Sequence, residues 1–226
     1  MLSKSRRGIA PNTYYHIFNR GAHRQDIFRN QHDLQRFLFS LLYLQSAVPF
    51  RNIARITAQF THATGFLVPL HTLEKIQENR FVDLVAFCLI PNHYHLLVQE
   101  TREGGIASYM QRVQGGYTKY FDTKYNASGH VFQGSYKAVP VESDRQLMYL
   151  SSYIHRNPRE LKEWKDKEET YPWSSLQDYI TANRWGGLLA TDIITSHFAQ
   201  TPNSNYRDFV RTSTAKTIED ELGEFI

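Results

Sequence analysis

The stretch FVDLVAFCLIPNHYHLLVQ, residues 81–99, decides how the chain folds. Its first part, Phe81 to Ile90, is apolar at nearly every position, which is typical of a central strand buried on both faces. Pro91 and Asn92 favour a turn, and the second part, His93 to Gln99, is again rich in branched and aromatic residues. The stretch therefore predicts two adjacent strands that form a hairpin.

The segments on either side of this hairpin indicate an α+β fold. Apolar residues three and four positions apart predict helices, and short runs rich in aromatic and branched residues predict strands. The expected elements are a strand at 14–19, a helix at 33–44, the two hairpin strands, a helix at 106–121, a strand at 136–141 and a helix at 143–156 that Pro158 stops. This order predicts the ferredoxin-like, split-βαβ arrangement, an antiparallel sheet with helices on one face.

The length of 226 residues suits one domain with an appendage. We expect residues 1–180 to form the main domain and 181–226 a small helical C-terminal extension. Within the main domain, 47–81 mixes prolines and scattered apolar residues without a clean period, which indicates an insertion.

Composition excludes several classes of protein. Apolar residues at 41% and aromatic residues at 14% are enough for a sizeable core, which excludes a disordered or fibrous chain. The longest apolar runs fall far short of the roughly 20 residues that a membrane span needs. Cys88 is the single cysteine, so no intrachain disulfide forms, and no secretory signal follows the basic N-terminus. These features predict a cytoplasmic protein without a membrane partner.

The densest chemical signal is the pair His93 and His95. Side chains on a strand alternate between faces, so both imidazoles share one face while Tyr94 points to the other. Two neutral imidazoles can bind one divalent cation. Taken alone, however, the pair is more typical of partly buried, hydrogen-bonded side chains.

A second signal lies at the end of the last predicted helix. Tyr153 and Asn157 are four residues apart and therefore share a helical face. The C-terminal end of a helix favours a nearby cation, and Asn157 offers an oxygen ligand there. The alternatives are a core aromatic residue for Tyr153 and a helix cap before proline for Asn157.

Together these segments resemble a known family. The motif IPNHYHLLV at 90–98, followed by YIHRNP at 153–158, resembles the REP-associated tyrosine transposases, which belong to the single-tyrosine HUH transposases of small insertion sequences. Three further segments are similar to the family: YHIFNRG at 15–21, GHVFQG at 129–134 and WSSLQDY at 173–179. Arg156 and Arg159 depart from it, because they stand where aliphatic residues are common.

The resemblance implies a function and a set of roles. Residues 1–180 would be the catalytic domain of a transposase that cleaves and rejoins single-stranded DNA at hairpin or palindromic repeats. Tyr153 would be the nucleophile that forms a 5′-phosphotyrosine bond, and His93, His95 and Asn157 would hold a divalent metal, Mg²⁺ or Mn²⁺. The protein would be a monomer or a homodimer, associated with the nucleoid when bound to DNA.

Single-stranded DNA needs cationic side chains near the site. We expect Arg20, Arg24, Lys119 and Lys137 to contact phosphates, because they flank the segments already assigned to the site. Two other functions remain open: a non-catalytic or domesticated DNA-binding regulator on the same fold, and a nickase of the replication-initiator or relaxase type.

Overall fold

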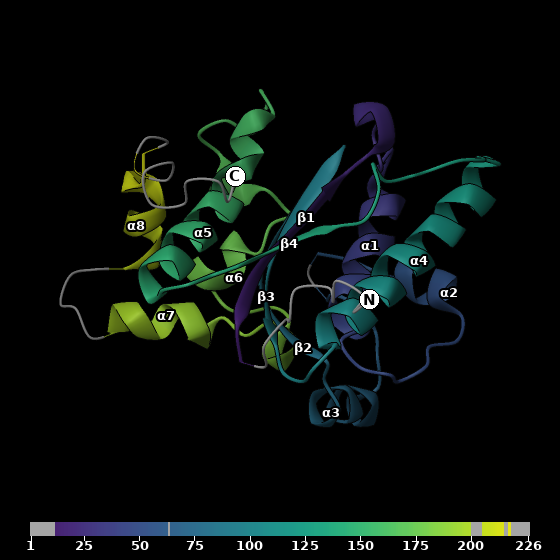
Figure 1. Ribbon diagram of the computed structural model, residues 1–226, viewed down its shortest axis with the longest axis horizontal. Helices are drawn as coiled ribbons and strands as arrows, with labels where there is room; N and C mark the ends of the chain where they lie inside the picture. The colour runs from purple at the N-terminus through teal and green to yellow at the C-terminus, as the bar shows by residue number, and fades with distance from the viewer. Residues whose placement is uncertain (1–11, 63, 200–204, 215–216, 218–226) are drawn as a thin grey trace, which may run out of the picture.

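The computed structural model describes residues 12–62, 64–199, 205–214 and 217, and it places four strands in one sheet between helices (Figure 1). The strands are β1 Tyr14–Arg20, β2 Val82–Ile90, β3 His93–Glu100 and β4 Lys137–Pro140. The α-helices are α1 Gln31–Tyr43, α2 Ile53–Ala58, α3 Leu70–Glu78, α4 Gly105–Tyr125, α5 Asp144–Arg156, α6 Leu176–Ile180, α7 Asp192–Ala199 and α8 Tyr206–Thr212. Short 3-10 helices are η1 Ala22–Arg24, η2 Asn157–Glu160, η3 Glu168–Thr170 and η4 Gly186–Leu188.

The sheet has the predicted topology. Its strand order is β2-β3-β1-β4, and every neighbouring pair is antiparallel. Strands β1 and β2 therefore run parallel to each other with β3 between them, which is the split-βαβ arrangement. The structure confirms the α+β class and the antiparallel sheet.

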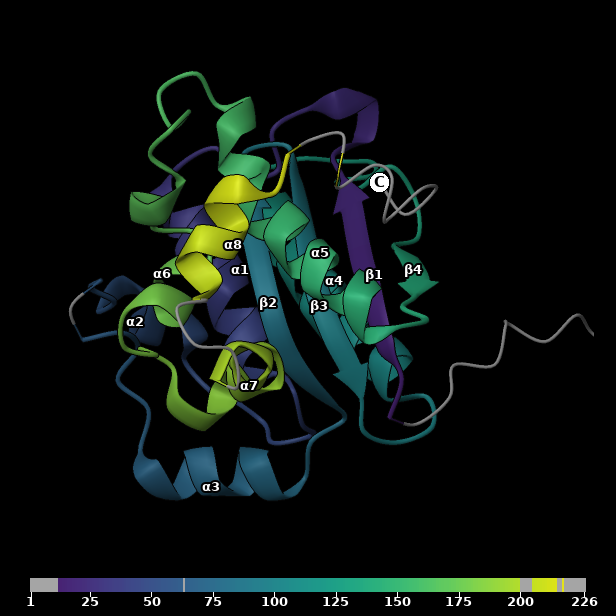
Figure 2. The same cartoon turned by 90° about the vertical axis from the view of Figure 1, so that its left-hand side faces the viewer.

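The helices, however, cover both faces of the sheet rather than the single face that we predicted. On β3, the Tyr94 ring packs 5.0 Å from Phe37 of α1, and its hydroxyl accepts a hydrogen bond from Gln114 of α4. The next residue, His95, points to the opposite face and meets Tyr153 of α5. Figures 1 and 2 show α1 and α4 on one side of the sheet and α5 on the other. Because β2 and β3 are apolar on both faces, each face needs a covering layer.

Strand β2 lies at an edge of the sheet, although its sequence predicts a central strand. Its outer edge is covered by the segment that follows η3, which supplies the missing backbone partners. The backbone N–H of Leu89 donates to the carbonyl of Trp173, and that of Ser175 donates to the carbonyl of Phe87, at 3.0 Å each. A covered edge is buried like a central strand, which explains the continuous apolar sequence.

The predicted insertion at 47–81 contains α2 and α3 and joins the core through aromatic rings. Phe60 stacks on Trp173 and Trp185, and Phe66 packs against Phe39 of α1. The later helices also pack on the main body, since α8 and α7 both contact α5 (Figure 2). The domain boundary at residue 180 stays a prediction. None of the helices in the described ranges has the length and apolar character that a membrane span requires.

Candidate active site

The candidate site lies on the sheet face that α5 covers, at the start of β3, directly after the hairpin turn. His93 is the first residue of β3 and pairs with Arg20, the last residue of β1. His95, two residues on, is 7% exposed, and its ring lies 5.2 Å from that of His93. The shared face predicted for the two imidazoles is thus present in the structure.

Helix α5 brings the other two predicted residues to the same face. The Ser143 side chain caps its N-terminus by accepting a hydrogen bond from the backbone N–H of Gln146, which helps to define where the helix starts. At the C-terminal end of α5, Tyr153 and the capping residue Asn157 are one helical turn apart. The ring of Tyr153 lies edge-on to His95 at 5.3 Å between centroids.

Asn157 connects the helix end to the histidine pair. Its side-chain nitrogen donates to the carbonyl of Tyr153 at 2.9 Å, which orients its Oδ1 toward His93. That oxygen lies 3.3 Å from Nε2 of His93. The structure therefore brings together all four residues that the resemblance implied as metal ligands or nucleophile. His93 and Asn157 meet although they are 64 residues apart in the chain.

His16 is a fifth member that sequence reasoning missed. It lies on β1, is fully buried, and its Nε2 forms a 2.8 Å hydrogen bond with Nδ1 of His95. Its ring also contacts Tyr153 edge-on at 5.9 Å. The signal available in the sequence was alternation: His16 and Phe18 share one face of the first strand. The sequence did not show that His16 and Phe18 would lie next to His95, because that depends on the pairing of β1 with β3.

Glu160 is a further residue that the sequence did not single out. It ends η2, three residues after Asn157, and one of its carboxylate oxygens lies 3.8 Å from Nε2 of His93. Its side chain is 58% exposed, so it can reorient at low cost. It adds a second oxygen near the outer histidine.

Burial controls the protonation of the site. Burial lowers the pKa of His95 well below its ordinary value, and the neighbouring imidazoles of His16 and His93 lower it further. Burial also lowers the pKa of His93, with partial compensation from the Glu160 carboxylate. Both imidazoles are therefore neutral near pH 7, which is the form that binds metals.

The same burial keeps Tyr153 in its phenol form. Burial raises the pKa of the Tyr153 hydroxyl, the Glu160 carboxylate raises it further, and hydrogen bonding to Asn157 and the charge of Arg20 act in the opposite direction. A neutral phenol is a weak nucleophile, and a positive charge beside its oxygen would make it a stronger one.

The donor atoms present fit a divalent cation. Two ligands at right angles, each about 2.1 Å from an ion, lie about 3 Å apart, close to the separation of His93 Nε2 and Asn157 Oδ1. His95 uses Nδ1 toward His16, which leaves its other ring nitrogen as the ligand atom. Among the described residues, no three His, Cys, Asp or Glu side chains form a metal-binding group by themselves. A set of three ligands at this place would therefore include the amide oxygen of Asn157.

The four predicted phosphate contacts divide between the two sides of the molecule. Arg20 ends β1 opposite His93, and Lys137 of β4 places its ammonium 5.6 Å from the ring of Phe18, which itself stacks on His95. Arg24 lies in η1, and its carbonyl accepts a 3.5 Å hydrogen bond from the Asn92 side chain in the hairpin turn.

Lys119 does not join this group. It is exposed on α4, the helix that packs on the sheet face opposite to Tyr153. Helical spacing alone did not reveal which side of the sheet this helix would cover.

Two comparisons with known proteins found a similar family or structure. Residues 67–157 match the family model described as "Transposase IS200 like", a segment that contains His93, His95 and Tyr153 and ends on Asn157. A solved structure described as a REP-associated tyrosine transposase bound to a REP hairpin is similar with a TM-score of 0.50 and 15% identity, over 85% of this chain and 93% of that chain. No curated protein sequence matches the chain. The resemblance predicted from the motifs is confirmed over the matched segment.

Proposed function

We propose that this protein, whose residues 67–157 match the model of the IS200-like transposases, is a metal-dependent enzyme that cleaves and rejoins single-stranded DNA through Tyr153. The observation that carries the proposal is the meeting of His93, His95, Tyr153 and Asn157 on one face of the sheet. Metal ligands and a nucleophile side by side are what a phosphoryl transfer requires.

Tyr153 is the nucleophile in this proposal. Its phenolic oxygen forms a bond to the scissile phosphorus while the bond from phosphorus to the 3′-oxygen breaks. The phenol loses its proton, and the departing 3′-oxygen takes one up to become a hydroxyl. One phosphodiester replaces another, so the same atoms can react in reverse and join strands.

His93, His95 and Asn157 would hold Mg²⁺ or Mn²⁺ beside the phosphate. When bound, the ion supplies positive charge that neutralises the phosphate oxygens and favours ionisation of the phenol. His16 orients His95 through their hydrogen bond, because a ligating imidazole is usually fixed through its second nitrogen. Asn157 also ties the ligand set to the carbonyl of Tyr153, so nucleophile and ligands are held in one geometry.

Single-stranded DNA with hairpin or palindromic repeats is the proposed substrate. Support comes from the similar solved structure, in which a transposase is bound to a REP hairpin, and from the cations around the site. Arg20 and Lys137 would contact phosphates beside Tyr153, and Arg24 would do so from η1, next to the hairpin turn. This electrostatic part of the binding should weaken as salt rises.

The decisive experiment is covalent trapping. The protein is incubated with a labelled hairpin oligonucleotide and Mn²⁺, denatured, and separated by electrophoresis. Wild type should give an adduct that survives denaturation, and Tyr153→Phe should give none. Tyr149→Phe is the matched control, since Tyr149 lies one turn earlier on α5 and packs on Phe209 instead of the histidines. An undiminished adduct in Tyr153→Phe would contradict the proposed nucleophile.

A second measurement separates catalysis from DNA binding alone. If the protein were a non-catalytic regulator, His93→Ala and His95→Ala would leave its regulatory activity in cells unchanged. Its DNA binding would still weaken as salt rises. The proposal instead expects both variants to lose the adduct while retaining DNA binding in the presence of a chelator.

A further inference from the structure

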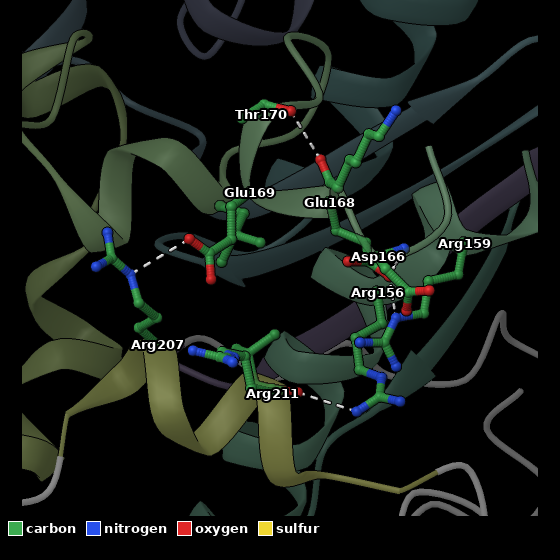
Figure 3. A pocket seen from close by; sticks show the side chains of 11 residues that line it. Arg156, Arg159, Asp166, Glu168, Glu169, Thr170, Arg207 and Arg211 are labelled. Carbon is green, nitrogen blue, oxygen red and sulfur yellow. Dashed lines mark hydrogen bonds and ion pairs between the residues drawn. The ribbon is translucent and has the colours of Figure 1, made fainter. Parts of the chain in front are cut away.

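A second group of cationic side chains surrounds the C-terminal end of α5. A cavity of about 550 Å³ opens between α8 and the connection from η2 to η3 (Figure 3). Its volume is in the range of ordinary ligand sites, but its lining is mainly charged. The charged lining residues are Arg156, Arg159, Asp166, Lys167, Glu168, Glu169, Arg207 and Arg211.

Only part of this positive charge is neutralised within the pocket. Arg159 forms an ion pair with Glu168, and Arg207 forms one with Glu169 at 3.4 Å. Within the ranges that the structure describes, Arg156, Lys167 and Arg211 have no carboxylate partner in an ion pair. Five cationic side chains against three acidic ones leave an excess of positive charge.

Arg156 is the most informative of the unpaired cations. It is half-buried, and its guanidinium donates to a neutral group, the backbone carbonyl of Val210 on α8, at 3.0 Å. Burial and the nearby charge of Arg159 lower the pKa of Arg156, and the Glu168 carboxylate acts in the opposite direction. A partly desolvated guanidinium with donors to spare is suited to a phosphate, which it can bind through two parallel hydrogen bonds.

The pocket and the candidate active site share one short segment. Asn157, which faces His93, is flanked in the chain by Arg156 and followed by Arg159 on the same 3-10 turn. Glu160 completes the turn on the side of His93. A DNA strand that crosses η2 could therefore reach the pocket directly from the scissile phosphate.

We propose that this pocket binds phosphates of the single-stranded DNA that flanks the hairpin, with Arg156 and Arg211 as the main contacts. The proposal rests on the proposed function, because it takes DNA as the substrate. The pocket would hold the flanking strand on the outer side of the tyrosine helix, so that the scissile phosphate stays aligned with Tyr153. Arg156, the departure from the family pattern at the end of α5, would thereby serve substrate binding.

Binding is best measured without cleavage, in the Tyr153→Phe background with a chelator. A fluorescent hairpin with a single-stranded flank is titrated with protein at several salt concentrations. Arg211→Ala removes an exposed side chain, so the fold should tolerate it. Affinity should fall about three- to tenfold, and the salt slope should become shallower by about 0.7 for one lost phosphate contact. Arg156→Gln should act in the same direction.

Arg55→Ala is the matched control, because Arg55 is an exposed arginine on α2, a helix packed against α1 on the other side of the sheet. If Arg211→Ala and Arg156→Gln bind the flanked hairpin as tightly as the control does, the proposal is wrong. Melting temperatures of all variants show whether Arg156→Gln loses binding because it unfolds. If it does unfold, the affinity of Arg211→Ala alone tests the proposal.

Competition with inorganic phosphate or a nucleoside triphosphate shows whether the pocket binds phosphates of DNA or a small anion. Under the proposal, the flanked hairpin displaces either anion from the pocket, and the Arg211-dependent affinity appears only when the single-stranded flank is present. Anion binding that depends on Arg211 but is not displaced by DNA would overturn it. Covalent trapping is scored separately, so a failure of this pocket and a failure of the Tyr153 mechanism give different results.

Discussion

Mild acid should loosen α5, the helix that carries Tyr153, because a buried neutral histidine holds that helix against its neighbours. His155 lies on α5, and its two ring nitrogens lie 2.6 Å from the hydroxyl of Tyr206 and 2.8 Å from that of Ser175. Tyr206 belongs to α8, and Ser175 bonds to the backbone of Phe87 in β2. His155 thus links the tyrosine helix to the sheet and to the C-terminal helix.

The size of the effect follows from the pKa of this imidazole. Burial lowers the pKa of His155 to about 3, against an ordinary value of about 6.5. At pH values between these two, the unfolded chain binds a proton that the folded chain excludes. The stability contribution is therefore complete above about pH 6.5 and is lost as the pH falls toward 3, by about 1.4 kcal/mol per pH unit. Between about pH 7.5 and pH 5 the loss is about 2 kcal/mol.

Urea unfolding of wild type and His155→Gln over this pH range tests the prediction. Glutamine keeps hydrogen-bonding capacity but does not titrate, so the variant should be less stable at neutral pH and should lose about 2 kcal/mol less on acidification. Other buried histidines, His93 and His95 among them, titrate in both proteins and cancel in the comparison. His32→Gln, at an exposed position on α1, is the matched control for the loss of a histidine. Identical pH dependence in wild type and His155→Gln would refute the reasoning, as would an NMR titration of His155 near pH 6.5.

Two other predictions concern metal binding and backbone packing. Replacing His16 by alanine should weaken Mn²⁺ binding about ten- to a hundredfold in titrations followed by electron paramagnetic resonance, because His95 loses the partner that orients it; unchanged affinity would contradict that role. Gly105→Ala should destabilise the protein by about 1–3 kcal/mol in urea, because a Cβ there would lie 2.1 Å from the carbonyl oxygen of Phe81. Gly115→Ala on the same helix meets nothing within 4 Å and should stabilise it by up to about 1 kcal/mol, so equal effects at the two glycines would argue against the packing.

Local sequence signals located most of the secondary structure. The hairpin was predicted at 81–99 and is found as β2 and β3, joined at Pro91 and Asn92. The helix predicted at 143–156 is α5, capped by Ser143. Such signals depend on a few neighbouring residues, which is why they can be read without the fold.

The segment at 47–81 carries no local pattern that predicts its structure. Its helices α2 and α3 are short, and its aromatic residues, such as Phe60 and Phe66, pack on distant partners that include Trp173 and Trp185. Burial there follows from contacts more than a hundred residues apart in the chain, so no local period records it.

The sequence by itself determined which residues share a strand face or a helix face: His93 with His95, and Tyr153 with Asn157. Backbone geometry sets these relations, because side chains alternate on a strand and recur every turn on a helix. Only the tertiary structure decided that the two pairs meet, that His16 lies behind His95, and that Lys119 lies on the far side of the sheet. Those outcomes depend on strand order and on which face each helix covers, and both are set by long-range packing of a sheet that is apolar on its two faces.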